Sequence, residues 1–285
     1  MRHITSRILC SLFLVTGLSG IVNAQGLPTS QPGLLQINRE EVKFGHEADH
    51  VKTEAGWPAA FEKAKDPNFY IALSAMTGSS EVWFISPYDS HRAMADSLKR
   101  NAEPAMAAQL GALTRADAVH VSSARSIIAI GRKDLSRGAF PDTAKQRFYD
   151  ITIFRVRPGH EDQFAAAAKA FGAAAGRAVP GMSFRVYEVI AGMPSPTYLA
   201  ISSVTSFGEF DKAQADGEAT MKAASAEERA ALQKFDTEGA INTETQRFRL
   251  DPEMSYVPKE TKAQDPAFWM PKKPAAAAPK KAASQ

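Results

Sequence analysis

The chain carries the same order of strand-like and helix-like patterns twice, and this repetition most strongly constrains its fold. Each set reads strand, helix, hairpin, two helices, strand, judged from two-residue and 3.6-residue apolar periodicities and from Gly- and Pro-rich turns. The first set comprises residues 34–43, 45–65, 69–76, 82–85, 90–101, 103–118 and 126–132. The second comprises residues 148–157, 160–179, 182–191, 197–205, 207–224, 226–239 and 242–250.

A short identity supports the duplication. Gly45-His46-Glu47 opens the first helix of one set, and Gly159-His160-Glu161 opens that of the other, so that His46 and His160 are 114 residues apart. Agreement in order and spacing is stronger evidence than three shared letters. The sequence therefore predicts an α+β fold of two tandem halves, each β-α-β-β-α-α-β.

An antiparallel unit of this order is ferredoxin-like: helices cover one face of a four-stranded sheet, and the other face needs a partner. Because two such halves lie in one chain, we expect them to pack sheet to sheet as an α+β barrel. The strand residues expected to be among the buried ones are Ile151, Ile153, Val186, Ile201 and Val204.

This arrangement resembles the dimeric α+β barrel superfamily, which includes antibiotic-biosynthesis-monooxygenase-like and NIPSNAP-like domains. The resemblance covers about residues 34–250 and extends to the segment RVRPGHE at 155–161, which is similar to the strand-to-helix junction of these domains. It implies a fold, and it brings no catalytic signature with it.

The N-terminus predicts export. Residues 1–24 combine Arg2 and Arg7, an apolar run from 8 to 22 and a small residue, Ala24, suited to signal peptidase. Cys10 precedes most of the apolar run, a poor position for lipid attachment, and the mature chain from Gln25 then contains no cysteine. We expect a periplasmic or secreted protein that does not span the membrane and uses no disulfide.

The predicted organisation is a signal peptide at 1–24, a linker at 25–33, a first half at 34–132, a linker at 133–147, a second half at 148–257 and an extended, disordered Pro/Ala/Lys tail at 258–285. The net charge of +3 falls to −3 without the two signal-peptide arginines and the four lysines of the last fifteen residues. The folded body is therefore not a basic, nucleic-acid-binding surface.

One motif suggests a metal. His46-Glu47-Ala48-Asp49-His50 matches H-E-x-x-H, in which two histidines one helical turn apart bind zinc and the glutamate activates water. The charge of Asp49, the lack of a third-ligand motif and the presence of Phe164 where the second half would need its second histidine argue against it. We interpret the shared Gly-His-Glu as a helix start and expect neither a metal nor a cofactor.

Four residues are candidates for ligand binding. Arg155 and Arg185 lie on predicted strands and could bind an anionic group, although strand arginines more often form ion pairs with residues such as Glu188. Trp83 and Tyr70 could line a cavity, although aromatic residues in strands are usually core.

The leading functional hypothesis is an exported α+β barrel protein that binds a small apolar or amphipathic ligand between its halves, because each half has an unpaired sheet face and no catalytic set is evident. A cofactor-independent oxygenase-like enzyme is one alternative, and an envelope interaction protein is another. The sequence decides neither enzymatic activity nor oligomeric state.

Overall fold

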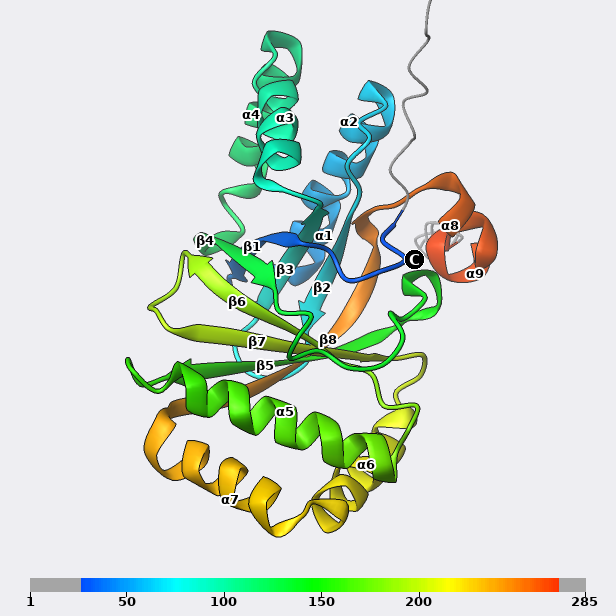
Figure 1. Ribbon diagram of the computed structural model, residues 1–285. Coiled ribbons are helices and arrows are strands. Elements are labelled where there is room, and N and C mark those ends of the chain that lie inside the picture. Colours follow the sequence, from blue (N-terminus) through cyan, green and yellow to red (C-terminus); the bar gives the residue numbers. More distant parts are fainter. Residues whose placement is uncertain (1–26, 272–285) are drawn as a thin grey trace, which may run out of the picture.

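A computed structural model describes residues 27–271, which form one closed antiparallel barrel with helices outside it (Figure 1). The strands are β1 (Leu34–Val42), β2 (Tyr70–Ala75), β3 (Glu81–Tyr88), β4 (Val121–Gly131), β5 (Phe148–Val156), β6 (Arg185–Ala191), β7 (Thr197–Val204) and β8 (Ala240–Tyr256). Their order around the barrel is β1-β3-β2-β8-β5-β7-β6-β4. The predicted α+β class and the closure into a barrel are thus confirmed.

Each half of the chain supplies four neighbouring strands. The N-terminal half contributes β4-β1-β3-β2 and the C-terminal half β8-β5-β7-β6, and the two sets join through the pairs β2–β8 and β4–β6. Because backbone hydrogen bonds continue across both junctions, no strand of the barrel is left as an open edge.

The helices form two layers on opposite sides of the barrel (Figure 1). The N-terminal layer consists of α1 (Glu47–Glu54), α2 (Gly56–Ala64), α3 (His91–Asn101) and α4 (Pro104–Asp117). The C-terminal layer consists of α5 (Glu161–Ala178), α6 (Glu209–Ala223) and α7 (Ala226–Lys234), followed by a π-helical turn at Phe235–Gly239.

Local sequence explains several helix starts. Gly45 and Gly159 have φ angles of +83° and +87° just before α1 and α5, a conformation that glycine adopts without strain. Ser90 caps α3 by accepting a hydrogen bond from the Ala93 amide, and Ser225 forms a capping box with Glu228 on α7.

The barrel interior is an apolar core built from both halves. Trp83 on β3 and Phe248 on β8 are fully buried, and their ring centroids lie 5.1 Å apart. Ile151 and Ile153 belong to this core as expected, and Ile201 packs against it half-buried. Val186 is buried as expected, but on the outer face of the barrel beneath the C-terminal helices, because alternation alone does not say which face of β6 is inside.

Val204 is only half-buried, at the end of β7, and so contributes less to the core than expected. Residues 27–33 of the predicted linker lie against the barrel. Gln31 is buried there and donates a hydrogen bond to the Val186 carbonyl at 2.9 Å.

The segment after Val257 was expected to be extended and disordered, and for residues 259–269 this is wrong. It forms two short helices, α8 (Lys259–Gln264) and α9 (Pro266–Trp269). Trp269 is 4% exposed, packs against the barrel core and donates a hydrogen bond from its indole to the Ala144 carbonyl at 3.0 Å. Buried Trp269 and the ion pair of Asp265 with Arg147 thus hold a segment whose composition otherwise suggests a tail.

The predicted signal peptide and the lysine-rich end of the tail lie outside the described residues, so export stays a prediction. Between residues 27 and 271, no helix is both long and apolar enough to cross a membrane.

Candidate functional site

The barrel interior offers little room for a ligand between the halves. A pocket of about 110 Å³ lies at one end, lined by residues of both halves such as Leu35, Tyr149, Arg185 and Tyr187. Pockets for small organic ligands usually measure roughly 300–1,000 Å³. The interior is therefore mainly packed core.

The structure does not bring the four predicted ligand residues together. Arg185 lines the small pocket, but its guanidinium donates hydrogen bonds to the carbonyls of Arg137 and Gly138 and so holds the inter-half linker. Trp83 is buried in the core, where its indole donates a hydrogen bond to Glu81 at 2.8 Å. Arg155 is half-buried near the end of β5.

Tyr70, the fourth predicted residue, lies on the outer face of the sheet. Its ring makes an edge-on contact with Phe61 at 6.0 Å, under the N-terminal helices. There it lines a larger cavity of about 370 Å³, which we call the helix-side cavity. Its walls come from β1, β2, β3 and β4 of the sheet, from α1, α2 and α3, and from the loop at 66–68.

The helix-side cavity has an aromatic wall and a polar wall. Trp57, Phe61, Tyr70, Phe84 and Tyr88 supply the aromatic rings. The polar lining includes Asn38, Glu40, Glu54, Asn68, Ser86, Asn101, Arg125 and Ser126. A site of this composition suits a molecule with an apolar body and one or more polar groups.

Four polar atoms on the cavity lining are buried without a hydrogen-bond partner in the described part of the chain. They are the Glu40 Oε2, Trp57 Nε1, Asn68 Nδ2 and Asn101 Oδ1 atoms. A buried polar atom left unpaired costs about 1–3 kcal/mol, so a ligand that pairs with these atoms would gain in affinity.

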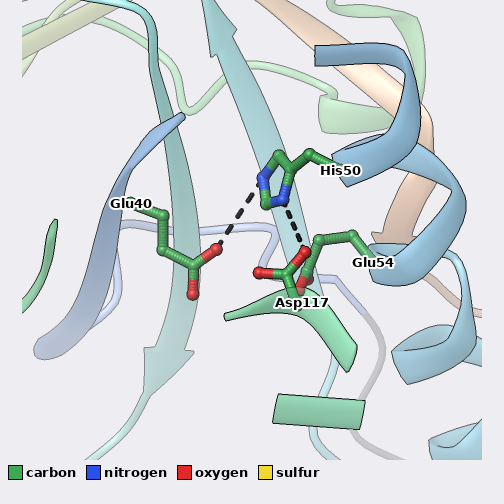
Figure 2. Close-up of side chains that lie close together, drawn as sticks. All are labelled: Glu40, His50, Glu54 and Asp117. Atoms are coloured by element: carbon green, nitrogen blue, oxygen red, sulfur yellow. Dashed lines mark hydrogen bonds and ion pairs between the residues drawn. The ribbon is translucent and has the colours of Figure 1, made fainter. Parts of the chain in front are cut away.

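Glu40 on β1 and Glu54 on α1 line one part of the cavity, which we call its inner end. These two residues lie close to two further ionisable side chains, His50 on α1 and Asp117 at the end of α4 (Figure 2). One ligand-type atom from each lies within 4.8 Å of those of the others. The His50 ring is 1% exposed; its Nδ1 lies 2.8 Å from Asp117 Oδ1, and its Nε2 lies 3.7 Å from Glu40 Oε2. We call these four residues the acidic–histidine cluster.

Burial and crowding set the charges of this cluster. Burial raises the pKa of Glu40 to about 7, and repulsion from Asp117 adds to it. Burial also raises the pKa of Glu54 to about 9, with repulsion from Glu40 and Asp117. Burial acts in the same direction on Asp117, but hydrogen bonds from His50 and Thr53 outweigh it and keep the pKa of Asp117 below its usual value.

The residues of the H-E-x-x-H motif lie in separate environments. His46 faces His120, with their Nδ1 atoms 3.0 Å apart, near the surface. Glu47 is exposed and lies 3.4 Å from the Ser80 hydroxyl. His50 is buried with Asp117. The motif as such therefore does not form one ligand set.

The sequence analysis missed Glu40, Glu54 and Asp117. Glu54 could have been found, because it lies four residues after His50 and so on the same face of α1. Glu40 and Asp117 could not, because they join the cluster from a strand and from a helix that ends 63 residues after Glu54.

No family model matches the sequence, and no curated protein matches it. Solved structures do match in fold. An anthrone oxidase-like protein is 14% identical with a TM-score of 0.53, over 78% of this chain and 93% of its own. A monooxygenase candidate from Fusobacterium nucleatum is 9% identical with a TM-score of 0.50, over 78% and 94%. A chlorite dismutase mutant from Candidatus Nitrospira defluvii is 11% identical with a TM-score of 0.48, over 79% and 94%.

At these identities the comparisons show a shared fold alone. The chain has the α+β barrel fold of monooxygenase-type proteins, which supports the superfamily resemblance at the level of the fold.

Proposed function

We propose that this protein binds a small, partly aromatic organic molecule in the helix-side cavity of its N-terminal half. The observation that carries the proposal is the cavity itself, with about 370 Å³ of space, an aromatic wall, and unpaired polar atoms on Glu40, Asn68 and Asn101. The proposed site lies under the helices, whereas the sequence analysis expected a ligand between the two sheets.

The aromatic wall defines the chemical class of the ligand. The Tyr70 ring makes edge-on contacts with Phe61 and Phe84, at centroid distances of 6.0 and 6.1 Å, and these rings offer a surface for a further flat ring by stacking or edge contact. Carboxyl oxygens at the inner end accept hydrogen bonds, so a ligand with a hydroxyl or amine donor fits better than an anion.

An oxygenase-like enzyme is the second candidate. The acidic–histidine cluster at the inner end favours it, because buried ionisable groups beside a ligand cavity are typical of catalytic sites. One structure of the same fold is described as anthrone oxidase-like, and an activated aromatic compound would suit this cavity as well.

Binding can be tested with 1-naphthol as the probe, which carries an aromatic body and one hydroxyl donor. Fluorescence titration of the purified chain should show saturable binding. Replacing Ala124, an exposed residue of β4 on the cavity lining, with tryptophan should weaken binding at least tenfold, because the indole would occupy the space.

The matched control is Ala108→Trp, which adds the same indole to an exposed position on α4 away from the cavity lining. It should bind 1-naphthol as the unmodified chain does. Equal binding by both tryptophan variants and the unmodified chain would contradict the proposed location, and an absence of saturable binding would count against the ligand class.

A further inference from the structure

The two ring nitrogens of His50 lie in different surroundings. Nδ1 is hydrogen-bonded to Asp117, and Nε2 faces the carboxyl group of Glu40. The Asp117 carboxylate accepts a hydrogen bond from Nδ1–H at 2.8 Å. The same carboxylate oxygen accepts a hydrogen bond from Thr53, which fixes its orientation. This tautomer leaves the lone pair of Nε2 free.

The Nε2 atom has no hydrogen-bond partner among residues 27–271, although the His50 side chain is only 1% exposed. Its nearest acidic neighbour is Glu40 Oε2, at 3.7 Å, and that oxygen also has no hydrogen-bond partner. A separation of 3.7 Å is too long for a hydrogen bond. Figure 2 shows the ring between the two carboxyl groups, with one nitrogen toward each.

Two ligand atoms that each lie about 2.1 Å from one tetrahedral metal ion are roughly 3.4 Å apart. The Nε2 and Oε2 atoms are therefore separated by nearly the distance that a shared cation requires. Glu54 lies 4% exposed beside them and brings a carboxyl oxygen within the same 4.8 Å.

We propose that Glu40, His50 and Glu54 bind a divalent transition-metal cation at the inner end of the helix-side cavity, with Asp117 orienting the imidazole through Nδ1. A hydrogen bond from a carboxylate to the second nitrogen is the usual support of a metal-bound histidine. The three ligands leave room for a further one from the cavity side, where Glu40 and Glu54 line the wall.

The ligand set narrows the choice of metal. One imidazole with two or three carboxylates suits Zn²⁺, Fe²⁺ or Mn²⁺, whereas Ca²⁺ and Mg²⁺ prefer all-oxygen sites and Cu⁺ prefers sulfur. A dication also compensates the repulsion among the carboxyl groups of Glu40, Glu54 and Asp117. Of the residues of the H-E-x-x-H motif, this site contains only His50. It is therefore different from the zinc site that the sequence analysis argued against.

The test uses the untagged full chain, stripped with a chelator, dialysed and titrated with Zn²⁺ by calorimetry and with Co²⁺ by visible absorption. We expect one equivalent of metal per chain and the absorption bands of a low-coordinate Co²⁺ site. Glu40→Gln and His50→Phe should each weaken binding at least 100-fold. Asp117→Asn should weaken it about 10- to 100-fold, as loss of an outer partner typically does.

His46 and His120 provide the control, because this surface pair could bind metal by itself. The double variant His46→Ala/His120→Ala should bind within threefold of the unmodified chain. If that variant loses the metal and His50→Phe retains it, the proposal is wrong. Absence of stoichiometric binding by the folded, unmodified chain would also overturn it.

Two features keep the test interpretable. Glu40→Gln preserves the shape of the side chain. His50→Phe introduces a phenylalanine, the residue found 114 positions later in the C-terminal half, at Phe164. Circular dichroism should therefore show that both variants are folded. Binding of 1-naphthol is measured separately, and the metal site can therefore fail without the proposed ligand site failing.

Discussion

The two halves differ in the side chains that lie beneath their helix layers, polar in the N-terminal half and aromatic in the C-terminal half. β5 and α5 begin 114 residues after β1 and α1, at Phe148 and Glu161 against Leu34 and Glu47. At this offset Glu40 and His50 correspond to Phe154 and Phe164. The first pair joins the acidic–histidine cluster, whereas the rings of the second pair lie 5.3 Å apart in an apolar core.

The helix layers differ in the same sense. In the C-terminal half one 18-residue helix, α5, lies across the sheet, and Phe164 stacks on Tyr198 at 4.0 Å. In the N-terminal half the corresponding stretch is divided into α1 and α2, and the layer encloses the helix-side cavity. The comparison teaches that the helix layer of the C-terminal half packs on an apolar core, whereas that of the N-terminal half combines an apolar cluster with a cavity and buried ionisable groups.

The largest expected effect comes from separating the halves. We expect residues 25–140 and 141–285, produced as two chains, to be insoluble or self-associating alone and to recover solubility when mixed. Each half alone exposes inner residues such as Ile37, Trp83, Ile151 and Phe248, at a cost of about 25 cal/mol per Å² of apolar surface. Light scattering and ultracentrifugation measure this. Two stable monomers with separate cooperative transitions would mean that the halves are independent domains.

The next largest expected effect is the loss of stability on substitution in the apolar core beneath the C-terminal helices. Phe164→Ala should lower the free energy of unfolding by about 3–5 kcal/mol, because the ring is 3% exposed and contacts Phe154, Tyr198 and Phe235. Urea denaturation measures the loss. His160→Ala, four residues earlier and without a capping hydrogen bond, should change stability by no more than about 0.5 kcal/mol. A similar loss of unfolding free energy in both variants would mean that Phe164 has no special role in the apolar core of the C-terminal half.

The smallest expected effect is the change in the free energy of unfolding caused by Glu40→Gln in the acidic–histidine cluster. Its sign should depend on whether metal is bound. With a chelator present, Glu40→Gln should raise the free energy of unfolding by on the order of 1–3 kcal/mol, because it removes one buried, mutually repelling carboxyl group. With saturating Zn²⁺ the unmodified chain should become the more stable one. Thermal unfolding in the two buffers measures the difference, and an unchanged order would contradict a metal-binding role for Glu40.

Much of the architecture could be predicted from the sequence because it depends on local periodicity. The two-residue alternation of Ile151 and Ile153 identified inward positions, and the recurrent element order led to the barrel. The interior ligand site was less predictable, since side-chain volumes decide whether a barrel is filled, and Trp83 and Phe248 fill much of this one.

The sequence by itself determined the number and order of strands, the glycine turns that start α1 and α5, and the difference between His50 and Phe164 at the 114-residue offset. Only the tertiary structure decided that Glu40, His50, Glu54 and Asp117 meet, and that Tyr70 faces the helices instead of the barrel. The physical reason is that periodicity specifies which residues share a face of one element. Which faces then come together is decided by the packing of helices on the closed sheet, over separations of up to 77 residues from Glu40 to Asp117.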